Sequence, residues 1–248
     1  MKISAVIPAA GRGSRMGESG GIDKPYILLG DKPILAHTLI TLHASSIIDE
    51  IIIVVHSKYI KYCNDNIVKR YGLKNVKNVV KGEKTRLLSV YNGLKEVSLD
   101  SDLVLIHDGV RPFVDFKIIS RVIKEASSSG AAVAAVPERA TVKQVLKDRV
   151  IHSTLNRESL WEVQTPQVFR RELILSAYKR AKELGIDATD DAALVEAIGH
   201  KVKVVMGSYS NIKITTPEDI DWGRFYFLQK ENRLRMMYKP KEVSKWKK

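Results

Sequence analysis

The feature that most constrains the fold is the alternation of short aliphatic runs with segments of helical periodicity over the first half of the chain. The continuous aliphatic run at 51–55 is typical of a strand that is covered on both faces. Strands are expected at 4–7, 51–55, 76–80, 103–106 and 131–136, and helices at 34–43, 59–71, 86–97 and 116–127. This alternation predicts an α/β fold with a mostly parallel, doubly wound twisted sheet, which binds its ligands at the carboxyl ends of the strands.

A glycine-rich turn, PAAGRGSRMG, follows the first expected strand. Three glycines and two cations stand out in and after it: Gly11, Gly13, Gly17, Arg15 and Lys24. Such glycines let successive N–H groups point at phosphate oxygens, and the two cations add mobile positive charge for a polyphosphate. No G-x-x-x-x-G-K-[ST] string occurs, and Met16 stands where a G-x-G-x-x-G fingerprint needs its third glycine. The turn therefore predicts a phosphate site of another kind, with a ligand-free tight turn as the alternative.

Polar residues follow two later strands at the same edge of the predicted sheet. They are Gly82, Arg86 and Ser89 after one strand, and His107, Asp108, Gly109, Val110, Arg111 and Pro112 after the next. A carboxylate beside a polyphosphate is unfavourable unless a cation lies between them, so Asp108 predicts a divalent metal, most plausibly Mg²⁺. A helix N-cap or turn role is the alternative for a single Asp. Arg111 and the upstream turn favour the metal site.

The alternation of strands and helices breaks between 138 and 161. Short alternating segments at 142–145 and 149–153 predict a projecting β-hairpin that forms a dimer arm on a second subunit. Helices are expected again at 172–184, at 190–198 with Thr189 as N-cap, and from Thr216 to about 228, with a strand at 202–206. Lys213 lies in an apolar stretch expected to be a strand, where a buried ammonium group needs an anion such as a ligand phosphate.

Composition favours one domain over residues 1–231, because no linker divides them, followed by a basic tail at 232–248. The net charge is +13, and the last twenty residues hold eight Lys or Arg and two Glu. Solvated charge is expected there rather than a nucleic acid or membrane contact. Cys63 is the only cysteine, no apolar run reaches transmembrane length, and Arg12 interrupts any signal-peptide core, so a cytoplasmic protein is expected.

Six blocks of sequence then match a known family. They are PAAGRGSRMG with Lys24, HDGVRPF, TVK at 141–143, NRESLWEVQTPQVF at 156–169, TDDA at 189–192 and NIKITTPED at 211–219. Together they resemble the 2-C-methyl-D-erythritol 4-phosphate cytidylyltransferases of the non-mevalonate isoprenoid pathway. The blocks occur in the family's order and cover the chain from Ile3 to about Leu228.

The resemblance implies a homodimeric enzyme with a Rossmann-like nucleotidyltransferase fold that uses CTP and holds Mg²⁺ at Asp108. By this resemblance Arg15 and Lys24 stabilise the transition state, and Arg157 and Lys213 position the sugar phosphate. The positions that match nucleotide contacts are Ala9, Ala10, Gly11, Gly13, Arg15, Lys24, Gly82, Ser89 and Asp108. Those that match the sugar-phosphate pocket are Asp108, Arg111, Thr141, Arg157, Thr165, Thr189 and Lys213. Thr141 and Arg157 lie in or beside the arm, which in the family reaches the partner's site.

The chain departs from the family's usual pattern at Pro25 in place of Gln, at Gly109 and Val110 in place of Ala-Ala, and at Ser210 in place of Asp. Two alternatives remain open at this stage. Ribitol-5-phosphate cytidylyltransferases share the nucleotide half, but the LWEVQTPQ and TDDA blocks favour methylerythritol phosphate as the acceptor. The other alternative is a catalytically silent nucleotide-binding or RNA-binding protein, against which the retained cations argue.

Overall fold

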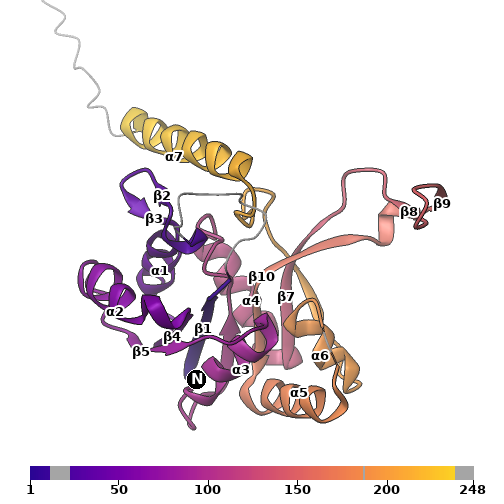
Figure 1. Ribbon diagram of the computed structural model, residues 1–248, viewed down its shortest axis with the longest axis horizontal. Helices are drawn as coiled ribbons and strands as arrows, with labels where there is room; N and C mark the ends of the chain where they lie inside the picture. The colour runs from indigo at the N-terminus through magenta and orange to yellow at the C-terminus, as the bar shows by residue number, and fades with distance from the viewer. Residues whose placement is uncertain (12–22, 187, 238–248) are drawn as a thin grey trace, which may run out of the picture.

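A seven-stranded sheet with the order β11-β7-β10-β6-β1-β4-β5 runs through the centre of the protein (Figure 1). The structure, a computed structural model, describes residues 1–11, 23–186 and 188–237, with the helical backbone alone at 230–237. The strands are β1 (Ile3–Ala9), β4 (Glu50–Val55), β5 (Val76–Lys81), β6 (Leu103–Ile106), β7 (Ala131–Pro137), β10 (Trp161–Arg170) and β11 (Lys203–Met206). All neighbours are parallel except β10, which is antiparallel to β6 and β7. The predicted α/β class with a mostly parallel sheet is confirmed.

Helices cover both faces of this sheet. α1 (Ile34–Ala44), α2 (Ile60–Cys63) and α4 (Phe116–Ser129) pack on one face, and α3 (Arg86–Lys95), α5 (Arg171–Leu184) and α6 (Asp191–Ala197) on the other. In β1, Ala5 and Ile7 join the first hydrophobic cluster and Val6 the second. Side chains alternate between the faces of a strand, so aliphatic runs without polar interruptions are what a sheet buried on both faces requires.

The helix expected at 59–71 is made of three consecutive pieces. A 3₁₀ turn at Ser57–Tyr59 leads into α2, and a π-helical segment at Asn64–Lys69 follows it. The apolar periodicity therefore located the helical region correctly, but it did not show the change in hydrogen-bond spacing along it.

The strand order reverses between β1 and β6. From β1 the chain moves outward through β4 to β5, and α3 then returns it to β6 on the other side of β1. Loops leave neighbouring strands in opposite directions at such a point, which opens a crevice at the carboxyl ends of the strands. The turn after β1 and the segment after β6 both begin at this crevice.

β10 was not among the predicted strands. It lies between β6 and β7, where Gln167 pairs with Ile106 on one side and with Val133 on the other. The pairing with β7 shifts register between Val163 and Gln167, so residues 164–166 form a bulge. Because β10 is antiparallel to its neighbours, this bulge lies at their carboxyl ends, beside the crevice.

β8 (Lys143–Val145) and β9 (Ile151–Thr154) form the predicted antiparallel hairpin, which projects away from the body of the protein (Figure 1). Four apolar side chains on it are half exposed or more: Val145, Leu146, Val150 and Ile151. This segment, together with its flanks at 138–161, is called the arm below.

The helices after the arm follow the predicted order, with one difference at a helix start. Gly185 ends α5 in the left-handed conformation, with φ of +63°. The N-cap of α6 is Asp190, not Thr189, because the Asp190 carboxylate accepts a hydrogen bond from the backbone N–H of Ala193 at 3.0 Å. α7 (Pro217–Met237) continues well beyond 228, and no helix in the described ranges is long and apolar enough to cross a membrane.

Candidate active site

A cavity of about 510 Å³ lies beyond the carboxyl end of β6, beside the bulge in β10 and the start of α6. Its lining includes five of the residues predicted for the site: Asp108, Arg111, Thr165, Thr189 and Lys213. Arg86, Gln164, Gln167 and Asp190 also line it. Side chains predicted from four separate blocks of sequence therefore share one cavity.

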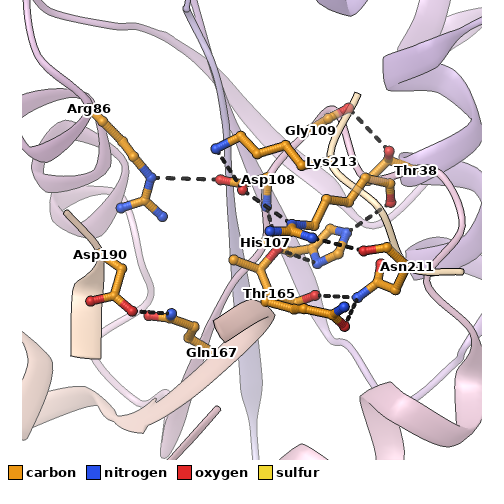
Figure 2. A network of polar contacts seen from close by, with 12 residues as sticks. Thr38, Arg86, His107, Asp108, Gly109, Thr165, Gln167, Asp190, Asn211 and Lys213 are labelled. Atoms are coloured by element: carbon orange, nitrogen blue, oxygen red, sulfur yellow. Dashed lines mark hydrogen bonds and ion pairs between the residues drawn. The ribbon is translucent and has the colours of Figure 1, made fainter. Parts of the chain in front are cut away.

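Asp108 is the centre of the charge arrangement in this cavity (Figure 2). Its Oδ2 lies 3.0 Å from Lys213 Nζ and 3.4 Å from Arg111 Nε, and its Oδ1 lies 3.6 Å from Arg86 Nε. Burial by itself would raise the pKa of Asp108, but the charges of Lys213, Arg86 and Arg111 outweigh burial and hold this pKa far below its ordinary value. The carboxylate is therefore ionised throughout the neutral range.

Lys213 does not lie in a strand, contrary to the prediction, because residues 211–215 have no regular secondary structure. Its side chain is about a third exposed, and its ammonium group already has an anion, Asp108. The prediction that Lys213 is buried, and so needs a ligand phosphate as its anion, was wrong, because the side chain is partly exposed and is already paired with Asp108. The residue is nonetheless a cation on the wall of the predicted cavity.

Few of the described side chains at the predicted metal site are available to hold a metal ion. Within the described residues, no group of three or more His, Cys, Asp or Glu side chains is placed to hold a metal ion. Mg²⁺ is commonly held by one or two carboxylates together with substrate phosphates and water. A single ionised carboxylate on the wall of this cavity fits that mode.

A chain of hydrogen bonds fixes the segment that carries Asp108. His107 Nε2 lies 3.2 Å from the Arg111 carbonyl, so Nε2 carries the proton and Nδ1 accepts from the Thr165 hydroxyl at 3.0 Å. The Thr165 hydroxyl in turn accepts from the backbone N–H of Asp108 at 3.0 Å. Burial lowers the pKa of His107 to about 4, so the ring stays neutral and this pattern persists at neutral pH. Thr165 therefore supports Asp108 as well as lining the cavity.

Two amide side chains that the sequence did not single out hold the segment before Lys213. Asn211 Nδ2 donates to Gln164 Oε1 at 3.1 Å and to the Thr165 carbonyl at 2.8 Å. Arg111 donates from its NH1 to the Asn211 carbonyl at 2.8 Å. These bonds join the bulge in β10 to the segment after β6 and to residue 211 (Figure 2), which sets the position of Lys213.

Of the residues predicted for nucleotide contacts, Ala9, Ala10 and Gly11 lie at and just after the end of β1, and Gly82 and Ser89 follow β5. A Cβ atom on Gly82 would be 2.3 Å from the Ala10 Cβ and 3.1 Å from the Ser89 Oγ, so only glycine fits there. Ser89 Oγ accepts from the backbone N–H of Glu83 at 2.9 Å, which ties this turn to α3. Ala9 is the last residue of β1, and a Cβ atom added to Gly11 would meet no atom of the described residues within 4 Å. Gly13, Arg15 and Gly17 lie outside the described residues.

Lys24 is buried at the start of a 3₁₀ turn, Lys24–Tyr26, and does not line the cavity around Asp108. Pro25 lies inside this turn, where its fixed φ is compatible with the backbone. Tyr26 stacks on Tyr59 with 4.0 Å between the ring centroids, so the turn is packed against the helical region that begins at 57. The departure at Pro25 therefore leaves the cation on a rigid turn.

The other two departures are also accommodated locally. The Gly109 carbonyl accepts from the Thr38 hydroxyl at 3.1 Å, and a Cβ atom at Gly109 would be 2.9 Å from Leu35 Cδ1. Ser210 shares a 2.8 Å hydrogen bond with the Ser208 hydroxyl, so no carboxylate is present at that position.

Thr141 and Arg157 are not brought to the cavity within one chain. Both side chains are exposed, and Arg157 donates from NH1 to the Arg139 carbonyl at 3.0 Å. They lie on the arm, on the segments that join it to the sheet.

A doubly wound sheet that gathers a small-residue turn, an ionised carboxylate and several cations at its switch point is the arrangement of a nucleotidyltransferase. The comparisons with known proteins make the assignment specific. The family model for 2-C-methyl-D-erythritol 4-phosphate cytidylyltransferase matches residues 3–229, and the chain belongs to that family.

Individual relatives agree with the family model. The chain is 50% identical over 230 residues to the 2-C-methyl-D-erythritol 4-phosphate cytidylyltransferase of Desulforamulus reducens, covering 93% of this chain and 97% of the relative. The corresponding protein of Alkaliphilus metalliredigens is 46% identical over 231 residues, covering 93% and 95%. Among solved structures, 4-diphosphocytidyl-2C-methyl-D-erythritol synthase from Anaerococcus prevotii aligns with a TM-score of 0.81 at 38% identity, covering 92% of this chain and 96% of that one.

Proposed function

We propose that this chain is an enzyme that transfers the cytidylyl group of CTP to 2-C-methyl-D-erythritol 4-phosphate. The products are 4-diphosphocytidyl-2-C-methyl-D-erythritol and pyrophosphate, and the reaction belongs to the non-mevalonate pathway to isoprenoid precursors. The observation that carries the proposal is the cavity in which Asp108, Arg111, Thr165, Thr189 and Lys213 come together in a member of this family.

The chemistry needs charge and position rather than a general base. A phosphomonoester is already anionic near neutral pH, so its oxygen can attack the α-phosphorus of CTP in line and displace pyrophosphate. Two polyanions must approach each other, and cations offset their repulsion and stabilise the charge that develops on the α-phosphate. In the proposal Arg15 and Lys24 act on the CTP phosphates, and Lys213 and Arg157 position the acceptor phosphate.

The remaining residues orient the two substrates. Ala9, Ala10, Gly11, Gly13, Gly82 and Ser89 are proposed to contact the nucleotide, where main-chain groups can lie close to the base and phosphates. Asp108, Arg111, Thr165 and Thr189 are proposed to hold the sugar alcohol. Asp108 would also hold a divalent cation, which when bound supplies further positive charge to the CTP phosphates.

We propose a homodimer in which the arm of each subunit completes the site of the other. Thr141 and Arg157 would then reach the cavity from the partner subunit, because neither side chain reaches it within one chain. The exposed apolar side chains of the hairpin support this assembly, since a second subunit would remove them from water.

The acceptor is the part of the proposal that a direct assay decides. Pyrophosphate release from CTP and Mg²⁺ is measured with 2-C-methyl-D-erythritol 4-phosphate and, separately, with ribitol 5-phosphate. The proposal predicts a kcat/KM at least about 100-fold higher for the methylerythritol phosphate. A preference for ribitol 5-phosphate, or no release with either acceptor, would contradict it.

A further inference from the structure

Arg86, the first residue of α3, stands between two carboxylates that come from different parts of the chain. It donates from NH1 to Asp191 Oδ1 at 2.9 Å and from NH2 to Asp191 Oδ2 at 2.7 Å. Its third nitrogen, Nε, lies 3.6 Å from Asp108 Oδ1 (Figure 2). Arg86 and Asp191 have no part in the function proposed above, yet they connect α6 to the carboxylate at the centre of the cavity.

The pair of Arg86 and Asp191 is built to be rigid. Asp191 has no exposed surface, and its Oδ1 also accepts a hydrogen bond from the Tyr178 hydroxyl. Burial opposes the charge of Arg86, but Asp191 and then Asp108 raise the pKa of Arg86 above its ordinary value. A bidentate contact between a planar guanidinium and a carboxylate fixes the plane of the guanidinium as well as its position. The location of the Arg86 Nε is therefore set by Asp191.

The two oxygens of Asp108 are held from different sides. Among the described residues, the ion pairs of Lys213 and Arg111 are with Oδ2, and the ion pair of Arg86 is with Oδ1. The torsion that turns an aspartate carboxylate about its Cβ–Cγ bond has broad minima, so it does not by itself choose an orientation. Without Arg86, the contacts of Lys213 and Arg111 to Oδ2 would not fix the rotation of the carboxylate about the Cβ–Cγ bond.

We infer that Asp191 and Arg86 are positioning residues for Asp108: Asp191 fixes Arg86, and Arg86 fixes the rotation of the Asp108 carboxylate toward the acceptor. The effect of this pair on the kinetics rests on the proposed function. Neither residue has to touch a substrate. If the pair only fastened α3 to α6, its loss would lower stability without changing how the cavity binds its acceptor.

The test compares three single variants with the wild type. Asp191→Asn keeps the shape of the side chain but removes its charge. Arg86→Lys keeps the positive charge but removes the planar guanidinium group that donates to both oxygens of Asp191. Glu50→Gln is the control, because it also replaces a buried, hydrogen-bonded carboxylate, at the opposite edge of the sheet. Kinetics are measured at a temperature at which circular dichroism shows all four proteins to be folded.

The inference predicts that Asp191→Asn and Arg86→Lys each raise the KM for 2-C-methyl-D-erythritol 4-phosphate by about tenfold and, through the divalent cation proposed at Asp108, raise the KM for CTP by a smaller factor. Glu50→Gln is predicted to leave both constants within about twofold of the wild type. Acceptor KM values for Asp191→Asn and Arg86→Lys that match the Glu50→Gln control would overturn the inference.

A crystal structure of the Asp191→Asn variant gives a second readout that does not depend on the reaction. The inference predicts that the Asp108 carboxylate is rotated relative to the wild-type crystal structure and that Arg86 Nε has left Oδ1. An Asp108 carboxylate with the same orientation as in the wild type would overturn the inference, whatever the activity of the variant. If the wild type fails to use the acceptor but Asp108 rotates in the variant, the proposed function fails and the positioning role stands.

Discussion

Asp108 carries a negative charge that three side chains of the same chain already balance. The sequence predicts a metal ion between Asp108 and a polyphosphate, but it does not show that Arg86, Arg111 and Lys213 surround this carboxylate. The low pKa of Asp108 follows from these cations. The fit of a divalent cation then depends on the phosphates that the nucleotide contributes.

The role proposed for Lys24 gives a prediction at the same scale. Lys24→Ala is expected to lower kcat by about 100-fold or more, because a positive charge proposed to act on the CTP phosphates is lost. Pyrophosphate release measures the rate, and circular dichroism checks the fold. Lys2→Ala is the matched control, since Lys2 forms an exposed ion pair with Asp100 at the opposite edge of the sheet. Near wild-type turnover in a folded Lys24→Ala protein would contradict the role.

Several contacts between individual residues could not be predicted from the sequence. Gln164 and Asn211 are 47 positions apart, and nothing local in either segment indicates that one amide accepts from the other. Thr189 and Asp190 are adjacent and both are good N-cap residues, so only the path of the chain decides that Asp190 caps α6. The motifs identified the positions, whereas the hydrogen bonds between them are set by the fold.

At the scale of elements, the parallel strands were predictable and β10 was not. The parallel strands β1, β4, β6 and β7 are largely aliphatic runs buried on both faces, which leaves a clear pattern. β10 contains two glutamines and Pro166, and a proline normally argues against a strand inside a sheet. The bulge at 164–166 accommodates the proline and turns Gln164 and Thr165 toward the cavity. The part of β10 that departs from the sequence pattern of a strand is therefore the part that lines the candidate site.

Glu50, the first residue of β4, links three elements at the other edge of the sheet and predicts a pH dependence of stability. It accepts from the Ser4 hydroxyl of β1 at 2.6 Å and from the backbone N–H of Ser98, beyond α3, at 2.7 Å. Burial raises the pKa of Glu50, but hydrogen bonds from Ser4 and Ser98 outweigh it and lower this pKa from 4.5 to about 2. The folded protein holds its proton less tightly than the unfolded chain, so this stabilisation is complete above pH 4.5 and is lost as the pH falls toward 2.

Urea unfolding at a series of pH values tests this linkage. Between neutral pH and about pH 3, the wild type is expected to lose about 1–3 kcal/mol more unfolding free energy than Glu50→Gln, which has no proton to take up at this position. Glu50→Gln is expected to be the less stable protein at neutral pH. Parallel pH profiles for the two proteins would show that Glu50 is not the group responsible.

At the scale of the whole molecule, the arm is expected to carry the dimer contact. Ile151→Asp places a charge on a side chain that is 58% exposed within one chain, so the subunit should still fold. The variant is expected to elute as a monomer in size-exclusion chromatography with light scattering, and to lose activity because Thr141 and Arg157 no longer reach a partner's site. Leu99→Asp, at a position that is 86% exposed, is the control and should behave as the wild type. A dimeric Ile151→Asp protein would contradict this assembly.

The central claim is that cations gathered at the carboxyl edge of one sheet bring two phosphate-bearing substrates together. The most direct test is kcat/KM for pyrophosphate release from CTP and 2-C-methyl-D-erythritol 4-phosphate by the Lys213→Met variant, with Lys2→Met as the control. Because Lys213 lies 3.0 Å from Asp108 on the cavity wall, the account predicts a loss of about 100-fold or more for Lys213→Met and none for Lys2→Met. Equal kcat/KM values for the two folded variants would contradict the claim.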